Sequence, residues 1–231
     1  MPESHEPLKR RIRSFVKREG RLTQGQQRAL DEYFSIYGID LEQGMLDFDV
    51  IFERKAVRIF EIGFGNGVSL LEMAQHNPQN DYFGVEVHRP GVGNLLSQIK
   101  EKELSNVRVS NDDAIEVLNQ QIPEQSLDVV HLFFPDPWHK RNHHKRRIVQ
   151  DEFVQLIRSK LKIGGTLHMA TDWKDYAKHM MLVLTRAKGF INMAGEGRYV
   201  ERPGLRPITK FEQRGKKLGH DVWDLIFTKK N

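Results

Sequence analysis

The stretch VRIFEIGFGNG, residues 57–67, decides the fold. Residues 57–63 have the pattern of a buried strand that ends at a glycine, and residues 68–77 (VSLLEMAQHN) have the apolar spacing of a helix. A strand, a glycine-rich turn and a helix in this order are typical of the first unit of an α/β sheet that binds a ligand beyond its strand ends. Glycines in the turn let a ligand approach the backbone closely.

The alternation of strand and helix continues along the rest of the chain. Strands are predicted at 57–63, 81–88, 106–113, 126–138, 165–172, 190–197 and 221–230, and helices at 68–77, 91–104, 114–122, 146–162 and 173–189. Helices between successive strands favour parallel pairing, with helices on both faces of the sheet. The last two strand candidates have no full helix between them, so one of this pair is expected to run antiparallel. The predicted fold is a mostly parallel α/β sheet of seven strands.

Composition narrows the class of protein. The chain has 231 residues, a formal net charge of +5 and no cysteine. Disulfides, thiolate zinc sites and cysteine nucleophiles are therefore excluded. The sequence shows neither an apolar run long enough to span a membrane nor the apolar core of a secretory signal, so a cytoplasmic protein without membrane contact is expected.

Basic residues gather in two runs, 9–21 (KRRIRSFVKREGR) and 140–147 (KRNHHKRR). A single run is usually a solvated face, but two dense runs favour a polyanionic partner, because neutralised phosphates release counterions. We predict a mobile basic arm at 1–21, followed by a single domain at 22–231. A solubilising tail is the alternative for the arm.

The residues of the glycine turn indicate the kind of ligand. Gly63, Gly65 and Gly67 depart from the G-x-G-x-x-G spacing of a dinucleotide site. Glu61, just before them, repels a pyrophosphate but suits a cationic ligand. We predict that these four residues bind the cofactor.

Further acids follow the second and third predicted strands. Glu86 stands where such folds bind ribose hydroxyls, and Asp112 and Asp113 stand where an adenine amino group can be held. Each acid alone could instead cap a helix. The set as a whole predicts a nucleoside ligand that has a positive end and no phosphates, and S-adenosylmethionine fits this description.

A stiff acidic turn stands directly before the second basic run, in FFPDPWHKRNHHKRR (133–147). Pro135 and Pro137 restrict the backbone on both sides of Asp136, which we expect at the mouth of the fourth strand. Trp138 can stack on a base or pack in the core. The histidines of this run have no acid or cysteine at ligand spacing, so no metal is expected.

Five motifs together resemble the bacterial tRNA (guanine-N7-)-methyltransferases: EIGFGNG, GVEVHRPGVG, FFPDPWHKRNHHKRR, ATDW and RPITKFEQRGKKLGHDVWDL. The resemblance implies the class I, Rossmann-like methyltransferase fold. It also implies S-adenosylmethionine as donor, S-adenosylhomocysteine as product, and N7 of the guanine at tRNA position 46, in the variable loop, as acceptor.

The resemblance also implies roles for particular residues, by motif position. Asp136 resembles the catalytic residue. The cofactor-binding acids are Glu61, Glu86, Asp113 and Asp136. The substrate-binding positions are Lys140, Asp172, Thr209, Lys210, Phe211 and Glu212. The RNA-contact segment is Asn142, His143, His144, Lys145, Arg146 and Arg147. The expected partner is tRNA, and the oligomeric state is left open between monomer and homodimer.

Two other classes of function remain as alternatives. One is a nicotinamide-dependent oxidoreductase on a similar sheet, which the glycine spacing and Glu61 disfavour. The other is a non-catalytic RNA-binding protein that keeps the sheet, which the intact set of acids and glycines disfavours. Binding of the cofactor and a methyl-transfer assay with bulk tRNA distinguish the three.

Overall fold

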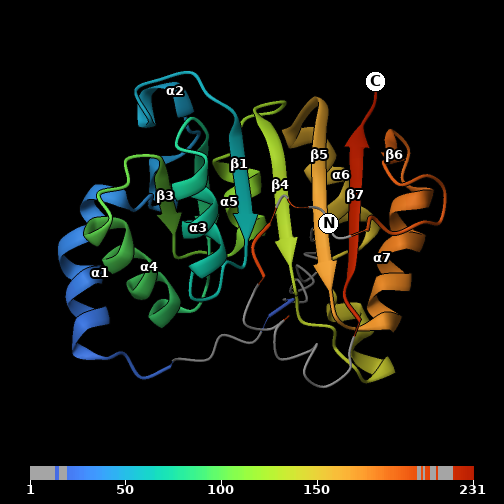
Figure 1. The fold of residues 1–231 in the computed structure, drawn as a ribbon, viewed down its shortest axis with the longest axis horizontal. Helices are drawn as coiled ribbons and strands as arrows, with labels where there is room; N and C mark the ends of the chain where they lie inside the picture. The colour runs from blue at the N-terminus through green and yellow to red at the C-terminus, as the bar shows by residue number, and fades with distance from the viewer. Residues whose placement is uncertain (1–13, 16–19, 202–203, 205, 209–211, 213–220) are drawn as a thin grey trace, which may run out of the picture.

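The computed structural model describes residues 14–15, 20–201, 204, 206–208, 212 and 221–231 of the chain (Figure 1). Its strands are β1 Arg58–Ile62, β2 Asp81–Val85, β3 Val107–Ser110, β4 Leu127–Phe133, β5 Leu161–Thr171, β6 Phe190–Asn192 and β7 Trp223–Lys229. Its α-helices are α1 Gln24–Tyr37, α2 Phe48–Ile51, α3 Val68–His76, α4 Arg89–Glu101, α5 Ala114–Gln120, α6 Asp151–Lys160 and α7 Lys174–Arg186. Two short 3₁₀ helices, η1 Leu41–Gln43 and η2 Arg141–Arg146, complete the described elements.

The seven strands form one sheet in the order β3-β2-β1-β4-β5-β7-β6. Neighbouring strands from β3 to β5 are parallel, whereas β7 lies between β5 and β6 and is antiparallel to both. This confirms the predicted mostly parallel sheet with an antiparallel strand in the last pair. The chain proceeds outward from β1 in both directions, so the carboxyl ends of β1 and β4 flank the point where ligands bind in such sheets.

Helices cover both faces of the sheet, as predicted (Figure 1). Buried apolar residues of α1, α3 and α4 belong to the core on one face, and those of α5, α6 and α7 belong to the core on the other. Side chains alternate along β1, so Ile59 faces the first core while Phe60 and Ile62 face the second. The helices thus leave the carboxyl ends of the strands open to a ligand.

The first helix, α1, precedes the first strand and begins at a defined cap. Thr23 caps α1 with a capping box, in which its side chain accepts a bond from the backbone N–H of Gln26 and the Gln26 side chain accepts one from the backbone N–H of Thr23. α1 packs closely on α4, because a Cβ at Gly93 would lie 2.7 Å from the carbonyl oxygen of Gln26.

The helix predicted at 146–162 is wrong at both ends. Residues 147–150 are not helical, and α6 begins at Asp151. Arg147 and Val149 are buried while their neighbours are less so, which is the alternation of extended backbone packed against a core. At the other end, β5 starts at Leu161, directly after α6, so Gly164-Gly165 lie within the strand instead of before it.

The remaining boundaries differ by a few residues. β4 ends at Phe133, before Pro135, which has no N–H to donate to a neighbouring strand. β6 covers only the first part of the segment predicted at 190–197. Among the described residues, no helix has the length and apolarity needed to cross a membrane. The division into a basic arm and a single domain stays a prediction, because residues 1–13 and 16–19 lie outside the described part.

Candidate active site

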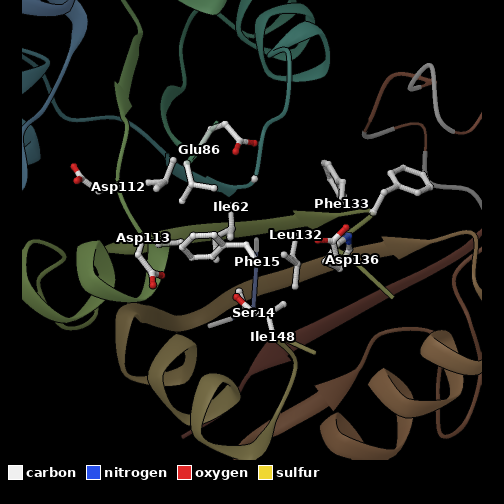
Figure 2. Close-up of a pocket in the computed structure, with 16 residues that line it drawn as sticks. Ser14, Phe15, Ile62, Glu86, Asp112, Asp113, Leu132, Phe133, Asp136 and Ile148 are labelled. Atoms are coloured by element: carbon white, nitrogen blue, oxygen red, sulfur yellow. The ribbon is translucent and has the colours of Figure 1, made fainter. Parts of the chain in front are cut away.

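A cavity of about 220 Å³ opens at the carboxyl ends of β1, β2 and β4. Figure 2 shows Asp112 and Asp113 toward one end of this cavity, Asp136 toward the other, and Phe15 between them. Gly63 and Glu86 also line it. The structure therefore brings the glycine turn, the acids after β2 and β3 and the acid of the proline turn to one place. We call this cavity the nucleoside cavity.

Glu86 holds the glycine turn in shape. One carboxylate oxygen accepts a hydrogen bond from the backbone N–H of Gly65, and the other accepts one from His88, both at 2.9 Å. Gly65 has a φ of +59°, a left-handed conformation that glycine adopts without strain. The first residues of α4 approach so closely that a Cβ at Gly91 would lie 2.1 Å from the carbonyl oxygen of Gly65. Burial raises the pKa of Glu86, although these backbone hydrogen bonds partly offset it.

The sequence left two roles open for the acids that follow β3, namely capping a helix and lining the ligand site. Asp113 caps α5 by accepting a hydrogen bond from the backbone N–H of Ile115 at 3.0 Å, and it also lines the nucleoside cavity. Asp112 accepts a hydrogen bond from the Ser110 hydroxyl at 2.8 Å and lines the same cavity. Capping therefore fixes Asp113 at the cavity wall.

Glu61 lies on the other side of the glycine turn, in an adjoining cavity that it shares with Gly63, Ser69 and Ile208. Its side chain is buried, and its Oε2 has no hydrogen-bond partner among the described residues. Nδ1 of His131 lies 3.8 Å from this oxygen. A buried carboxylate oxygen without a partner is costly, so this position suits a ligand that brings a positive charge.

The proline turn after β4 is strained and exposed. Phe134 and Trp138, which bracket it, both have a positive φ, of 51° and 48°. Asp136 is exposed and lines the nucleoside cavity. Trp138 is not a core residue, because its indole N–H donates to the carbonyl oxygen of Ser14 at 3.0 Å and the Arg146 guanidinium lies 4.9 Å from its ring centre. The turn therefore presents an acid and an aromatic ring at the cavity mouth.

The basic segment forms η2, next to this turn. Lys140, Arg141, Asn142 and Lys145 are exposed, and His143, His144 and Arg146 are half-buried. The described residues include no cluster of acids, histidines or cysteines that could hold a metal ion.

Arg147 differs from its neighbours because its side chain is buried. It donates to the carbonyl oxygen of Pro137 at 2.9 Å and to Asp175 of α7 at 2.5 Å, and it lies over the ring of Tyr176. The hydrogen bond from Arg147 lowers the pKa of Asp175. In this arrangement Arg147 ties the basic segment to α7, and a contact of this residue with RNA stays a prediction.

The predicted substrate-binding residues are only partly described. Asp172 is half-buried just after β5, and the rings of the adjacent Trp173 and His139 are 4.1 Å apart, which brings this strand end beside the basic segment. Thr209, Lys210 and Phe211 lie outside the described residues. Glu212 is buried, and one of its oxygens accepts a hydrogen bond from Arg206 at 2.5 Å.

Sequence reasoning missed a set of buried polar residues next to the site: His131, His168, Arg206 and Asp224. The two histidines and Asp224 stand at buried positions of otherwise apolar strands, a signal that the sequence does contain. Arg206 has no comparable signal, because its partners are distant along the chain.

The fold and the glycine turn together define a class I methyltransferase. Among solved structures, the 16S rRNA methyltransferase KamB is similar with a TM-score of 0.60 and 16% identity, over 81% of this chain and 95% of that one. An rRNA methylase from Streptococcus thermophilus has a TM-score of 0.52 and 12% identity, over 79% of this chain and 93% of that one. At these identities the likeness concerns the fold alone.

Closer relatives identify the family. The methyltransferase family model Methyltransf_4 matches residues 55–225. A tRNA (guanine-N(7)-)-methyltransferase of Hydrogenovibrio crunogenus is 61% identical over 95% of this chain and 91% of its own length. Those of Ectopseudomonas mendocina and Serratia proteamaculans are 59% and 56% identical, over 95% and 96% of this chain and 92% of each relative. The chain belongs to the bacterial tRNA (guanine-N7-)-methyltransferase family.

Proposed function

We propose that this protein transfers the methyl group of S-adenosylmethionine to N7 of a guanine in tRNA, the guanine at position 46 in the variable loop. The family membership supports the reaction, and the exposed basic segment beside the cavity supports a polyanionic acceptor. The oligomeric state, monomer or homodimer, and the cytoplasmic location remain predictions.

The residues present fit the proposed cofactor. Glu86 would accept bonds from the ribose hydroxyls, and Asp112 and Asp113 stand where an adenine amino group can donate. Glu61 would pair with the ammonium of the methionine part, which satisfies its buried Oε2. The two cavities share Gly63, so one ligand can lie across the glycine turn. The cofactor supplies the reactive methyl group as a sulfonium.

The chemistry places few demands on the protein. Guanine N7 has an in-plane lone pair and no proton, so attack on the methyl carbon needs no general base. Positioning is the main contribution to the rate. During transfer a positive charge develops on the guanine ring, and a carboxylate beside the ring stabilises it. Asp136, exposed at the cavity mouth, is our first choice for this carboxylate and Asp172 the second.

The basic segment would bind the phosphates of the tRNA near the reacting base. Lys140, Arg141 and Lys145 are exposed, and Arg146 lies over Trp138. A base that leaves its stack could rest on such an aromatic and guanidinium surface. Arg147 would act indirectly, by holding this segment to α7.

The single observation that carries the proposal is the position of Asp136, on a proline-bounded turn between the nucleoside cavity and the basic segment. The test is incubation of the purified protein with isotope-labelled S-adenosylmethionine and an unmodified tRNA transcript, followed by nucleoside analysis. Label should appear in 7-methylguanosine, and a transcript with adenine at position 46 should receive none. Label in another nucleoside, or tight binding of NAD in calorimetry, would overturn the proposal.

A further inference from the structure

One face of the sheet carries a buried row of polar side chains beside the active site. Glu61 of β1, His131 of β4 and His168 of β5 stand opposite one another in neighbouring strands. His168 Nε2 lies 2.8 Å from a carboxylate oxygen of Asp224, and this residue comes from β7. All four are nearly inaccessible to solvent. Polar groups in such a position need partners, because burial removes their water.

Arg206 lies at the end of this row. Two of its guanidinium nitrogens donate to the two oxygens of Asp224, each at 2.7 Å, and a third donates to Glu212 at 2.5 Å. The guanidinium is buried together with both carboxylates. Burial opposes ionisation of Asp224, but the hydrogen bonds from Arg206 and His168 outweigh it and keep the pKa of Asp224 below its usual range.

The same guanidinium contacts the residues that lead into the proline turn. Its carbon lies 5.7 Å from the ring centre of Phe133 and 5.5 Å from that of Phe134. Phe133 also stacks on His131, with ring centres 4.7 Å apart. Arg206, which itself lies between β6 and β7, is therefore in contact with Asp224 of β7, with the residues that lead into the proline turn, and with Glu212.

The residues next to Arg206 reach the cofactor side of the site. Ile208, two residues further along the chain, lines the cavity that contains Glu61. Within the described part of the chain, the helices on this face pack over β1, β2 and β3. Arg206 and the buried row occupy the corresponding position over β4, β5 and β7. Arg206 and its carboxylate partners therefore stand where an apolar helix would otherwise pack. Charge-assisted hydrogen bonds fix the orientation of side chains more strictly than apolar contacts do.

From these contacts we infer that Arg206 is a positioning residue for methyl transfer. Its bonds to Asp224 and Glu212 and its contacts with the two phenyl rings before Asp136 align the Asp136 turn with Glu212. The inference rests on the proposed function. Arginine is needed because its planar fork bonds both carboxylates while its faces lie over two phenyl rings. Lysine keeps the charge but is a point donor and cannot make this set of contacts.

The test compares Arg206→Lys with a matched control, Arg58→Lys. Arg58 is a buried arginine that bonds the buried Asp81, but it lies at the amino end of β1, away from the strand ends that form the site. Asp224→Asn is the second variant, because it weakens the hydrogen bonds of Arg206 by a change on β7. Each protein is measured for thermal unfolding, for binding of S-adenosylhomocysteine and of tRNA, and for single-turnover methylation of tRNA at saturating substrates.

We expect Arg206→Lys and Asp224→Asn to lower the single-turnover rate at least tenfold, with tRNA affinity changed less than threefold. Arg58→Lys should lower the melting temperature by a similar amount yet keep the wild-type rate at a temperature where all variants are folded. Equal rates for Arg206→Lys and wild type, or equal losses in the two lysine variants, would overturn the inference. A wild-type protein that fails to methylate tRNA would instead overturn the proposed function.

Discussion

Replacing Asp136 by asparagine tests the catalytic role most directly. The substitution keeps the shape of the side chain and removes its charge. A carboxylate in contact with the reacting base lies about 4 Å from the developing positive charge, an interaction of about 4 kcal/mol at an effective dielectric constant of about 20. Asp136 is exposed, so water screens part of this interaction. We expect a barrier higher by about 3 kcal/mol, which slows methyl transfer about 100-fold.

The stability of the protein should not change with this substitution. The Asp136 carboxylate makes no hydrogen bond or ion pair with another described residue, and its turn is held by Pro135, Pro137 and the contacts of Trp138. The free energy of unfolding is expected to stay within about 0.5 kcal/mol of wild type. Any loss of activity therefore reports on chemistry instead of folding.

The assay is single-turnover methylation of a tRNA transcript with saturating cofactor, so that neither binding step limits the rate. Asp172→Asn is measured in parallel, because it is the second candidate for the same role. Asp31→Asn, an exposed acid on α1 bonded to Gln27, serves as a remote control and should be fully active. A folded Asp136→Asn protein that methylates N7 near the wild-type rate would refute the reasoning and leave Asp172 or positioning alone to account for catalysis.

Three further predictions concern binding and stability. Replacing Lys145 and Arg146 together by alanine should weaken tRNA binding and reduce the slope of log affinity against log salt by about 1.5, without changing cofactor affinity; an unchanged slope in filter-binding titrations would mark them as solvated surface. Arg147→Ala should instead lower the free energy of unfolding in urea by about 2 kcal/mol, because it leaves the carbonyl oxygen of Pro137 without its donor and breaks the bond to α7; a stability equal to wild type would contradict its structural role. The pKa of Asp224 is lowered in the folded protein, so the stability that this charge contributes is present above the usual carboxyl range, about pH 4, and is lost as the pH falls through the folded value. Urea unfolding of wild type and Asp224→Asn should therefore differ at pH 7, and the difference in unfolding free energy should shrink as the pH falls below about 4. A difference that stays constant would show that the charge of Asp224 is not responsible.

The sheet and the residues that line the nucleoside cavity could be predicted, because the sequence patterns that indicate them are local. Period-two apolar runs separated by helices define the strands, and EIGFGNG identifies the strand that carries the ligand turn. Glu86 and Asp113 stand at strand ends, where topology alone brings them together. The structure confirms that these residues meet around one cavity.

The features that the sequence analysis did not predict depend on tertiary contacts. No pattern in the run of charges at 140–147 distinguishes Arg147 from its neighbours. Its side chain is nevertheless buried, because the backbone that follows is extended. No local pattern predicts the bonds of Arg206 to Asp224, since 18 residues separate the partners. The buried histidines were detectable as polar residues in apolar strands, but their alignment with Glu61 required the strand order.

The place of β7 in the sheet has a consequence during synthesis. The ribosome makes β6 before β7, yet β6 pairs only with β7 among the described strands, and the outer edge of β5 is filled by β7 alone. Until Trp223–Lys229 has emerged, the nascent chain therefore presents an open edge at β5, which other chains and chaperones can recognise. Asp224 arrives with the same strand, so Arg206 gains its anchor only then. The enzyme should become active in one step once β7 has paired with β5, instead of gradually as the domain grows.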